Sequence, residues 1–243
     1  MSVVAVIPAR MGSKRLPAKV LADVQGDPLV AHVWRNVKAC DQIDRVLVAT
    51  DSDDVANTMA PLGAEVVRSR NLHRTGSDRV AEAVSELDAD IVLNIQADNA
   101  FLDQHILEAV IACFADPSVQ VVTPICSFPD HLEPSDPSKV KAAIGVGGNA
   151  LYFSRAPIPH GGPWWLHVGI YGFRPSVLQQ FYGWSRGAIE SREDLEQLRF
   201  IENGVAIQTV QVAYSGVGID TPSDIARLSS RPPSSVDSRN QRF

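Results

Sequence analysis

The sequence predicts an α/β fold: a doubly wound, mostly parallel sheet with a small antiparallel extension. Residues 3–8 and 45–50 are continuous apolar runs, typical of parallel strands that are covered on both faces. Segments with a helical period separate these runs, as right-handed crossovers require. The chain has 243 residues and 45% hydrophobic content, enough for one large domain with a substantial core.

The N-terminal half alternates strands and helices in order. Further strands are expected at residues 64–68, 90–95 and 120–126, and helices at 28–40, 53–62, 77–87 and 102–114. Ser52 stands where the second helix needs an N-cap, and Gly63 where it needs a C-terminal cap. Ligands bind beyond the carboxyl ends of the strands in such sheets, so the segments after strands are the candidate site.

The pattern changes after residue 127. We expect a hairpin over 140–155 that turns at Gly147–Gly148–Asn149, a strand at 165–174, a helix at 191–204 and a strand at 205–212. Residues 1–228 are interpreted as one domain, with 127–205 as its antiparallel portion. The polar segment 229–243, rich in Pro and Ser, is expected to be disordered.

Charge and cysteine content exclude several classes of protein. There are 22 Lys and Arg against 28 Asp and Glu, which argues against a nucleic-acid binder because such a protein needs a basic face. The three cysteines show no CxxC spacing, so a disulfide framework or zinc site is not indicated and a reducing cytoplasm is expected. No apolar run approaches the roughly 18 residues of a membrane span.

A basic loop follows the first strand. Residues 9–19 contain the four cations Arg10, Lys14, Arg15 and Lys19, with Gly12 and Ser13 between them. Cations, backbone N–H groups and a hydroxyl at the edge of a sheet are what a triphosphate needs. The alternative is a solvated basic loop, but its position directly after a buried strand favours the phosphate site. The loop is neither a Walker A loop nor a GxGxxG motif.

Two carboxylates also follow predicted strands. Asp98 comes shortly after residues 90–95, and Asp220 follows residues 214–219. Thr221 and Pro222 can already begin the next helix, so Asp220 is not needed as a cap. Two carboxylates beside a triphosphate suit Mg²⁺, whose remaining ligands are phosphate oxygens and water. A purely structural role for either aspartate is the alternative.

Seven motifs together resemble one enzyme family. IPARMGSKRLPAK, VATDSDDVA, HRTGSDRVAE, NALYFSRAPIP, HVGIYGFR, LEQLR and GIDTPSD resemble, in order and spacing, the CMP-Kdo synthetases, the 3-deoxy-manno-octulosonate cytidylyltransferases. The resemblance covers about residues 2–228. It implies a nucleotide-diphospho-sugar transferase-like fold. It also implies Mg²⁺-dependent transfer of CMP from CTP to Kdo with release of pyrophosphate, as in lipopolysaccharide biosynthesis, and a homodimer without nucleic-acid or membrane partners.

The resemblance also implies roles for individual residues. The CTP-binding set is Ala9, Arg10, Gly12, Ser13, Lys14, Arg15, Lys19, His73, Thr75, Gly76, Ser77 and Arg79. The catalytic set is Arg10, Lys19, Asp98 and Asp220, and both aspartates hold the metal. The sugar-acid pocket is lined by Gln96, Arg155, His167, Tyr171, Glu196 and Gln197, within an acceptor-binding and dimerisation portion at 127–205. Some of these residues have an alternative role. Thr75 and Ser77 could instead cap the following helix, and His167 could have a structural role. Lys14, Glu196 and Gln197 could simply be exposed to solvent.

Two departures from the family pattern concern the acceptor. The family reads Gln-Gly-Asp-Glu-Pro around the metal aspartate, and this chain reads Gln-Ala-Asp-Asn-Ala at 96–100. The segment between Pro159 and His167 is shorter than in typical members and places Trp164 and Trp165 near the expected acceptor mouth, as a lid, a dimer contact or core. Another keto-acid sugar or a phosphonate is therefore an alternative acceptor. A non-catalytic nucleotide-binding protein is a third hypothesis, against which the presence of both Asp98 and Asp220 argues.

Overall fold

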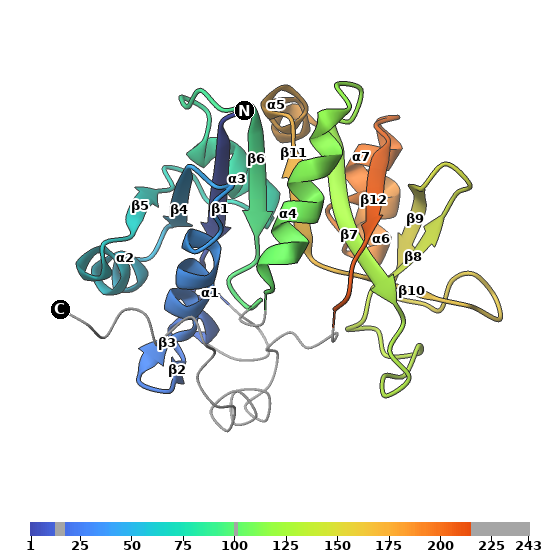
Figure 1. The fold of residues 1–243 in the computed structure, drawn as a ribbon, viewed down its shortest axis with the longest axis horizontal. Coiled ribbons are helices and arrows are strands. Elements are labelled where there is room, and N and C mark those ends of the chain that lie inside the picture. The colour runs from blue at the N-terminus through green and yellow to red at the C-terminus, as the bar shows by residue number, and fades with distance from the viewer. Residues whose placement is uncertain (13–17, 100–101, 215–243) are drawn as a thin grey trace.

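A ten-stranded sheet organises the molecule (Figure 1). The computed structural model describes residues 1–12, 18–99 and 102–214. The strand order is β10-β8-β9-β12-β7-β11-β6-β1-β4-β5, and a separate two-stranded hairpin joins β2 (Asp23–Val24) to β3 (Asp27–Pro28). No helix in the described ranges is both long and apolar enough to cross a membrane.

The N-terminal half is parallel, as the sequence predicts. β1 (Val3–Pro8) lies between β4 (Arg45–Thr50) and β6 (Ile91–Ile95), and β4 also pairs with β5 (Glu65–Arg68). β1 is buried at all of its positions, which explains its continuous apolar sequence. The predicted strands at 3–8 and 45–50 are confirmed with the same bounds.

Helices cover both faces of this sheet. Alternate residues of β1 enter two separate cores because successive side chains of a strand point to opposite faces. One core packs against α1 (Leu29–Lys38), α2 (Asp53–Met59) and α4 (Gln104–Ala112), and the other against α3 (Gly76–Ala83), α5 (Pro175–Gly183) and α7 (Leu198–Glu202). Short 3₁₀ turns lie at η1 (Lys19–Leu21), η2 (Ala60–Leu62) and η3 (Cys113–Ala115).

The C-terminal half makes the sheet mixed rather than mostly parallel. β7 (Val121–Ser127) pairs in parallel with β12 (Ile207–Gln211), whereas β8 (Lys141–Ile144) and β9 (Asn149–Ser154) form the predicted antiparallel hairpin. The turn of that hairpin contains Gly148 at φ 78°, a left-handed conformation that favours glycine. β9 also pairs with β12, so the small antiparallel extension is continuous with the main sheet.

The predicted strand at 165–174 is two strands. β10 (Trp165–His167) and β11 (Ile170–Phe173) both pair with β7, but on their other edge β10 pairs with β8 and β11 with β6. The break at Val168–Gly169 allows this change of partner. β10, β8, β9, β12 and β7 thereby form a closed ring of strand pairings beside the parallel half.

The predicted helix at 191–204 is also divided. α6 (Ala188–Glu193) ends at Asp194, which has φ 54° and therefore cannot continue a right-handed helix. α7 begins at Leu198 after a short linker. The predicted helix at 77–87 begins after Thr75 and ends at Ala83. Segment 215–243, which contains the expected tail, lies outside the described residues.

Candidate functional site

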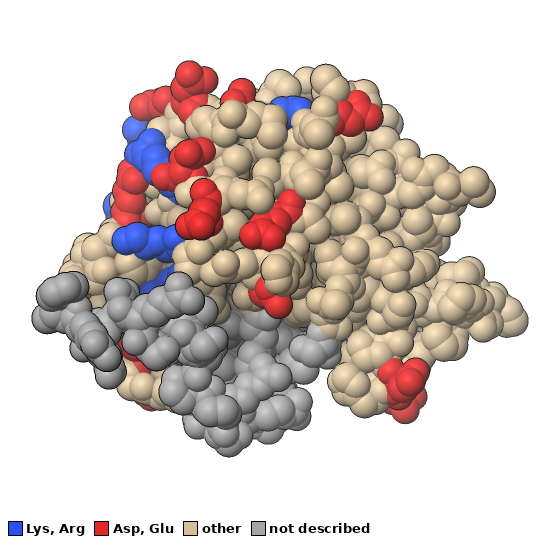
Figure 2. Space-filling view, viewed as in Figure 1, with Lys and Arg blue, Asp and Glu red and all other residues tan. Residues whose placement is uncertain are grey.

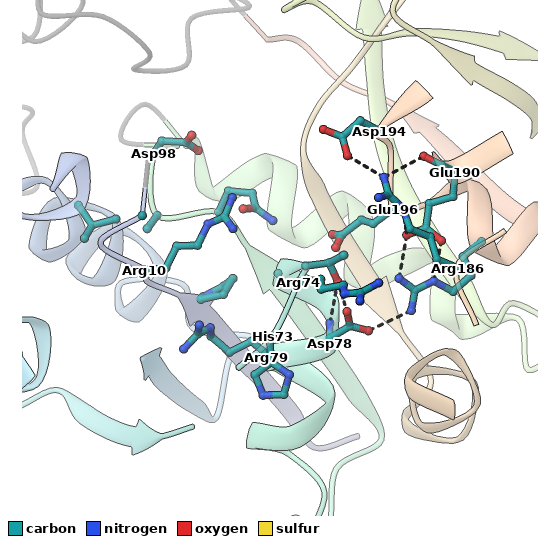
Figure 3. Close-up of a pocket in the computed structure, with 18 of the residues that line it drawn as sticks. Arg10, His73, Arg74, Asp78, Arg79, Asp98, Arg186, Glu190, Asp194 and Glu196 are labelled. Atoms are coloured by element: carbon teal, nitrogen blue, oxygen red, sulfur yellow. Dashed lines mark hydrogen bonds and ion pairs between the residues drawn. The ribbon is translucent and has the colours of Figure 1, made fainter. Parts of the chain in front are cut away.

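A cleft of about 1100 Å³ opens where β1 and β6 end. Five parts of the chain line it: the residues after β1, the residues after β6, the start of α3 with the residues just before it, Arg155, and the region from Trp184 to Arg199. Figure 3 shows Arg10 and Asp98 on one side of this pocket and Asp78, Glu196, Glu190 and Asp194 on the other. The expected position beyond the carboxyl ends of parallel strands is therefore confirmed for this cleft.

Most of the predicted site residues that can be placed line the cleft. They are Arg10, Gly12, Lys19, His73, Thr75, Gly76, Arg79, Gln96, Asp98, Arg155 and Glu196. The structure does not bring Ala9, Ser77, His167, Tyr171 or Gln197 to its lining. Ser13, Lys14, Arg15 and Asp220 lie outside the described residues.

Lys19 and Asp98 form an ion pair that joins the segment after β1 to the segment after β6. The Lys19 Nζ atom lies 2.8 Å from Asp98 Oδ2, although the residues are 79 apart in sequence. Lys19 is 8% exposed at its side chain and Asp98 38%, so the ion pair sits at the floor of an open cleft. Arg10 is exposed beside it. Ala9 is buried and donates its N–H to the carbonyl of Ala49, so it extends the sheet.

The start of α3 is held by hydroxyl and carboxyl groups. Thr75 is the N-cap, because its side chain accepts from the N–H of Asp78 at 3.1 Å. Ser77 is not the cap: its N–H and hydroxyl both donate to Glu196, at 3.1 and 2.9 Å. Burial raises the pKa of Glu196, and hydrogen bonding by Thr75 and Ser77 opposes that rise. The alternative role as a cap therefore holds for Thr75 and is wrong for Ser77.

His73 and Arg79 are engaged by protein groups. His73 Nε2 lies 2.7 Å from Glu82, and its side chain is 3% exposed. Arg79, also 3% exposed, donates to Asp51 and to the hydroxyl of Ser69, both at 2.9 Å. Both residues therefore fix the shape of the cleft wall more than they offer hydrogen bonds to a ligand.

Gln96 and Gly76 approach each other closely at the floor of the cleft. Gln96 Nε2 donates to Asn94 Oδ1 at 3.4 Å. A Cβ atom on Gly76 would lie 3.1 Å from Gln96 Nε2 and 3.5 Å from Cγ of Pro8. A residue larger than glycine at position 76 would therefore press on the Gln96 amide. This contact joins the expected nucleotide loop, which contains Gly76, to the expected acceptor pocket, which contains Gln96.

Arg155 is held by backbone carbonyl groups. Its guanidinium donates to the carbonyls of Glu193, Pro137 and Asp194 at 2.9 to 3.1 Å. Glu193 in turn accepts from the N–H of Arg155 at 3.0 Å, and the buried ammonium of Lys141 also donates to the Arg155 carbonyl. Three donors of the guanidinium are used in this way, and the other two have no partner among the residues that the structure describes.

The aromatic part of the expected acceptor pocket lies behind the cleft wall. His167 Nε2 pairs with the Thr123 hydroxyl at 3.0 Å, and burial lowers the pKa of His167 to about 3. Tyr171 is 4% exposed, stacks on Phe173, and has a raised pKa because it is buried. Trp165 packs against the second core and Trp164 packs edge-on against Phe128, so neither lines the cleft.

Sequence reasoning missed an ion network that joins α3 to the α6–α7 region. Arg199, 5% exposed, donates two hydrogen bonds of 2.8 Å to Glu190 and one of 3.0 Å to Asp78. Burial acts against the charge of Arg199, but its bonds to Glu190 and Asp78 raise its pKa. Arg186 pairs with Asp194 at 2.7 Å. Asp78 and Arg199 both fall within the family-like motifs HRTGSDRVAE and LEQLR, which were the only signal for them in the sequence.

Comparison with known proteins agrees with this geometry. The family model described as cytidylyltransferase matches residues 4–207. The 3-deoxy-manno-octulosonate cytidylyltransferase of Paramagnetospirillum magneticum is 42% identical over 91% of this chain and 94% of its own length. That of Chlorobium luteolum is 39% identical over 93% and 95%. The chain belongs to the 3-deoxy-manno-octulosonate cytidylyltransferase family.

Solved structures extend the likeness to the fold. A CMP:2-keto-3-deoxy-manno-octonic acid synthetase in complex with CTP superposes with a TM-score of 0.88 at 35% identity, over 94% of this chain and 97% of the other. The 4-diphosphocytidyl-2C-methyl-D-erythritol synthase of Anaerococcus prevotii, at 15% identity, has a TM-score of 0.65 over 94% of each chain. This second likeness shows the fold alone.

In this member of the cytidylyltransferase family, the residues that depart from the family pattern on either side of Asp98, Ala97 and Asn99, are both buried. Ala97 is 5% exposed and lines the cleft. Asn99 is 7% exposed, and its Oδ1 accepts from the hydroxyl of Tyr214 at 3.4 Å. Asn99 therefore connects the Asp98 turn to the described end of the chain.

Proposed function

We propose that the protein transfers CMP from CTP to a 3-deoxy-2-keto sugar acid, Kdo in the first instance, with release of pyrophosphate. Membership of the cytidylyltransferase family over nearly the whole chain supports the reaction class. The observation that carries the proposal is the pairing of Lys19 with Asp98 in the cleft at the ends of β1 and β6. That pair places a cation and a carboxylate together where a nucleotide triphosphate would lie.

The residues present fit a magnesium ion. Mg²⁺ is usually held by one or two carboxylates together with substrate phosphates and water. Asp98 supplies one partly exposed carboxylate, and we assign the second to Asp220, outside the described residues. Within the described ranges no group of three or more His, Cys, Asp or Glu side chains forms a closed metal site. When bound, the ion would neutralise phosphate charge and lower the pKa of a coordinated hydroxyl.

The chain's own residues would position the reactants. Arg10, Lys19 and the cations of the loop at 13–17 would contact the triphosphate and stabilise the charge that develops on the leaving pyrophosphate. The acceptor hydroxyl oxygen forms a bond to the α-phosphorus while the bond from that phosphorus to the pyrophosphate oxygen breaks, and the hydroxyl proton is released. Such a transfer depends on positioning and charge neutralisation, so no covalent protein intermediate is needed.

The acceptor would bind between Gln96, Arg155 and Glu196. The two remaining donors of the Arg155 guanidinium suit a carboxylate. Gln197, next to Glu196, has a buried Nε2 atom without a hydrogen-bond partner among the residues that the structure describes. Gln197 does not line the cleft, so this unmet donor, which costs about 1–3 kcal/mol, is not assigned to the acceptor. Residues 127–205, which supply Arg155 and Glu196, remain our proposed acceptor-binding and dimerisation portion.

A panel of acceptors tests the proposal. Pyrophosphate release from CTP would be measured with Kdo, with other keto-acid sugars and with phosphonates, each with Mg²⁺ and with EDTA. We expect release with Kdo that EDTA abolishes. Release with another acceptor alone would transfer the proposal to that acceptor. CTP binding without release for the whole panel would favour the non-catalytic alternative.

The proposal includes a homodimer in a reducing cytoplasm. The family resemblance supports the dimer. Cys40, Cys113 and Cys126 are all free thiols in the structure, which is compatible with reducing conditions. Light scattering on the purified protein would test the dimer, and a mass of about 26 kDa instead of twice that value would contradict it.

A further inference from the structure

The ends of β9 and α6 hold each other through the same two residues. The N–H of Arg155 donates to Glu193 Oε2 at 3.0 Å, and the Nε atom of Arg155 donates to the carbonyl oxygen of Glu193 at 2.9 Å. Each residue therefore binds the other with both its side chain and its backbone. The hydroxyl of Ser154, the last residue of β9, donates to the other oxygen of the Glu193 carboxylate at 2.8 Å. This reciprocal contact joins the antiparallel hairpin to the region that carries Glu196.

Among the residues that the structure describes, the Arg155 guanidinium is held by neutral groups alone. Its Nε and one terminal nitrogen donate to the carbonyl oxygens of Glu193 and Asp194, at 2.9 and 3.1 Å, where α6 ends. The other terminal nitrogen donates to the carbonyl oxygen of Pro137 at 2.9 Å. The last carbonyls of a helix lack partners within the helix, so a cation is well placed there. Carbonyl oxygens fix the orientation of the guanidinium without neutralising its charge.

Other arginines of the same cleft are neutralised. Three of them are each paired with a carboxylate at 2.7 to 3.0 Å: Arg79, Arg186 and Arg199. Arg155 lines the cleft with them, yet in the described ranges no carboxylate lies within ion-pair distance of its guanidinium. Guanidinium groups bind carboxylates through strong, charge-assisted hydrogen bonds. Arg155 is thus oriented by the protein while its charge remains available to an anionic ligand.

A buried lysine holds the other end of the Arg155 peptide unit. The ammonium of Lys141, a fully buried residue, donates to the carbonyl oxygens of Arg155 and Lys139, and to that of Asp136 at 3.1 Å. The backbone of Arg155 is therefore fixed by Glu193 at its N–H and by Lys141 at its C=O. Loss of the ammonium would take a donor from three carbonyl oxygens and disturb folding. Glu193 is only half-buried, so it is the anchor that can be replaced.

We propose that Glu193 is a positioning residue for the acceptor, because it holds Arg155 through the backbone where the guanidinium meets the anionic group of the sugar acid. Glu193 does not line the cleft, so it acts on the ligand only through Arg155. The inference rests on the proposed function in taking an acid as the acceptor and Arg155 as its partner. CTP should be little affected, because its expected contacts Arg10 and Asp98 lie on the other side of the pocket from Asp194 (Figure 3).

Two substitutions separate the hydrogen bonds of Glu193 from its charge. Glu193→Ala removes both acceptor oxygens. In Glu193→Gln the amide oxygen can still accept from the N–H of Arg155, while the NH₂ group donates to the hydroxyl oxygen of Ser154, which can accept as well as donate. The matched control is Glu133→Ala. Glu133 is exposed, does not line the cleft, and makes no side-chain hydrogen bond or ion pair within the described part of the chain.

A double-mutant cycle with Arg155→Ala is the primary measurement. Calorimetry would give the dissociation constant of Kdo, and of each other acid of the acceptor panel, with CTP and EDTA present so that no turnover occurs. We expect Glu193→Ala to weaken acid binding by about tenfold or more through a misplaced guanidinium, whereas Glu193→Gln and Glu133→Ala stay within about threefold of the wild type. In the Arg155→Ala background, Glu193→Ala should have little further effect, because the group that it positions is absent.

Steady-state kinetics provide the second measurement. Glu193→Ala should raise the KM of the acceptor by the same factor of about ten, with kcat and the KM of CTP changed by less than about twofold. A merely structural role would weaken both substrates and would act equally in both backgrounds of the cycle. Thermal unfolding would show that each variant is folded. Should Glu193→Ala not fold, Glu193→Asp takes its place in the cycle, because it keeps the charge but shortens the side chain by one carbon.

Four results would overturn the inference. They are additive losses in the double variant, equal losses of acid and CTP binding in Glu193→Ala, unchanged acid binding in that variant, and a wild type that binds no acid of the panel. Failure of the proposed function is distinguishable from these outcomes. A protein that binds an acid and shows the expected coupling, yet releases no pyrophosphate, would keep the inference and lose the enzyme assignment. Release with Kdo together with additive losses would do the reverse.

Discussion

At the scale of single residues, the Lys19–Asp98 ion pair places a positive and a negative charge side by side in the cleft. The ammonium of Lys19 is nearly buried, and its partner oxygen lies 2.8 Å away. Removing one member of such a pair takes away a hydrogen bond and a compensating charge from the other. Asp98 therefore has two roles in our proposal, since it would orient Lys19 and hold the magnesium ion.

Asp98→Asn should lower turnover by at least about a thousandfold, because an amide is a poor magnesium ligand and no longer compensates Lys19. Pyrophosphate release at saturating CTP and acceptor would measure the effect. Thermal unfolding should show that the variant remains folded. Near-normal turnover would refute the metal assignment for this residue.

Position after a strand was enough to predict that Arg10, Lys19 and Asp98 lie at one edge of the sheet, because the carboxyl ends of parallel strands meet there. Their roles in CTP and metal binding came from the family resemblance and stay predictions. Asp78 and Arg199 were not assigned a role. Their ion pair joins helices far apart in the chain, and no local pattern reports such a contact. His167 and Tyr171 came from the family resemblance, and the structure places both behind the wall.

At the scale of elements, the N-terminus of α3 contacts both the end of β6 and the α6–α7 region. Gly76 is its first residue and lies against Gln96 from the end of β6. Ser77 and Asp78 receive hydrogen bonds or ion pairs from the α6–α7 region. A small shift of this helix end would alter both ligand subsites together.

Gly76→Ala should lower kcat/KM by about threefold to tenfold, because the new methyl group would lie 3.1 Å from Gln96 Nε2 and displace that amide slightly, and a full 1 Å misplacement costs about a hundredfold. The backbone of Gly76 does not have positive φ, so the helix itself should form. Gly147→Ala is the matched control, since nothing lies within 4 Å of the point where its new methyl group would sit. Equal activities of the two variants would argue against a functional contact between Gly76 and Gln96.

Elements of the N-terminal half were predictable because each has a local cause: buried runs for strands, and caps such as Ser52 for helices. The divisions at Asp194 and at Val168–Gly169 were not. β10 and β11 separate because they pair with different strands on one edge, and strand propensity carries no information about partners. α6 ends at Asp194, whose backbone has the left-handed conformation. Aspartate permits this conformation but does not require it.

At the scale of the whole molecule, folding keeps neutral a histidine at the end of β10, one of the strands in the ring of pairings. The pKa of His167 is about 3 in the folded state because of burial, compared with about 6.5 in an unfolded chain. The unfolded state therefore binds more protons between those values. Stability from this residue is complete above about pH 6.5 and is lost as the pH falls toward 3.

His167→Gln should make unfolding less sensitive to acid. Between pH 7 and pH 5 the wild type should lose about 2 kcal/mol more unfolding free energy than the variant, from about 1.4 kcal/mol per pH unit below about 6.5. Urea unfolding at the two pH values measures this difference, and packing losses that do not depend on pH cancel. Identical pH dependence in both proteins would show that His167 is not held neutral.

The closed ring of pairings also limits the number of sheet edges that could pair with another molecule. Because β10 pairs with both β7 and β8, the described sheet has one free lateral edge, at β5. Glu65 and Arg68 on that short strand pair with Arg45 and Asp53, and Figure 2 shows acidic and basic side chains intermingled on the side where Figure 1 places β4 and β5. A short edge strand with charged side chains is a poor template for pairing with a strand of another molecule. The ring of pairings thereby leaves a short strand with charged side chains, β5, as the open edge of the described sheet.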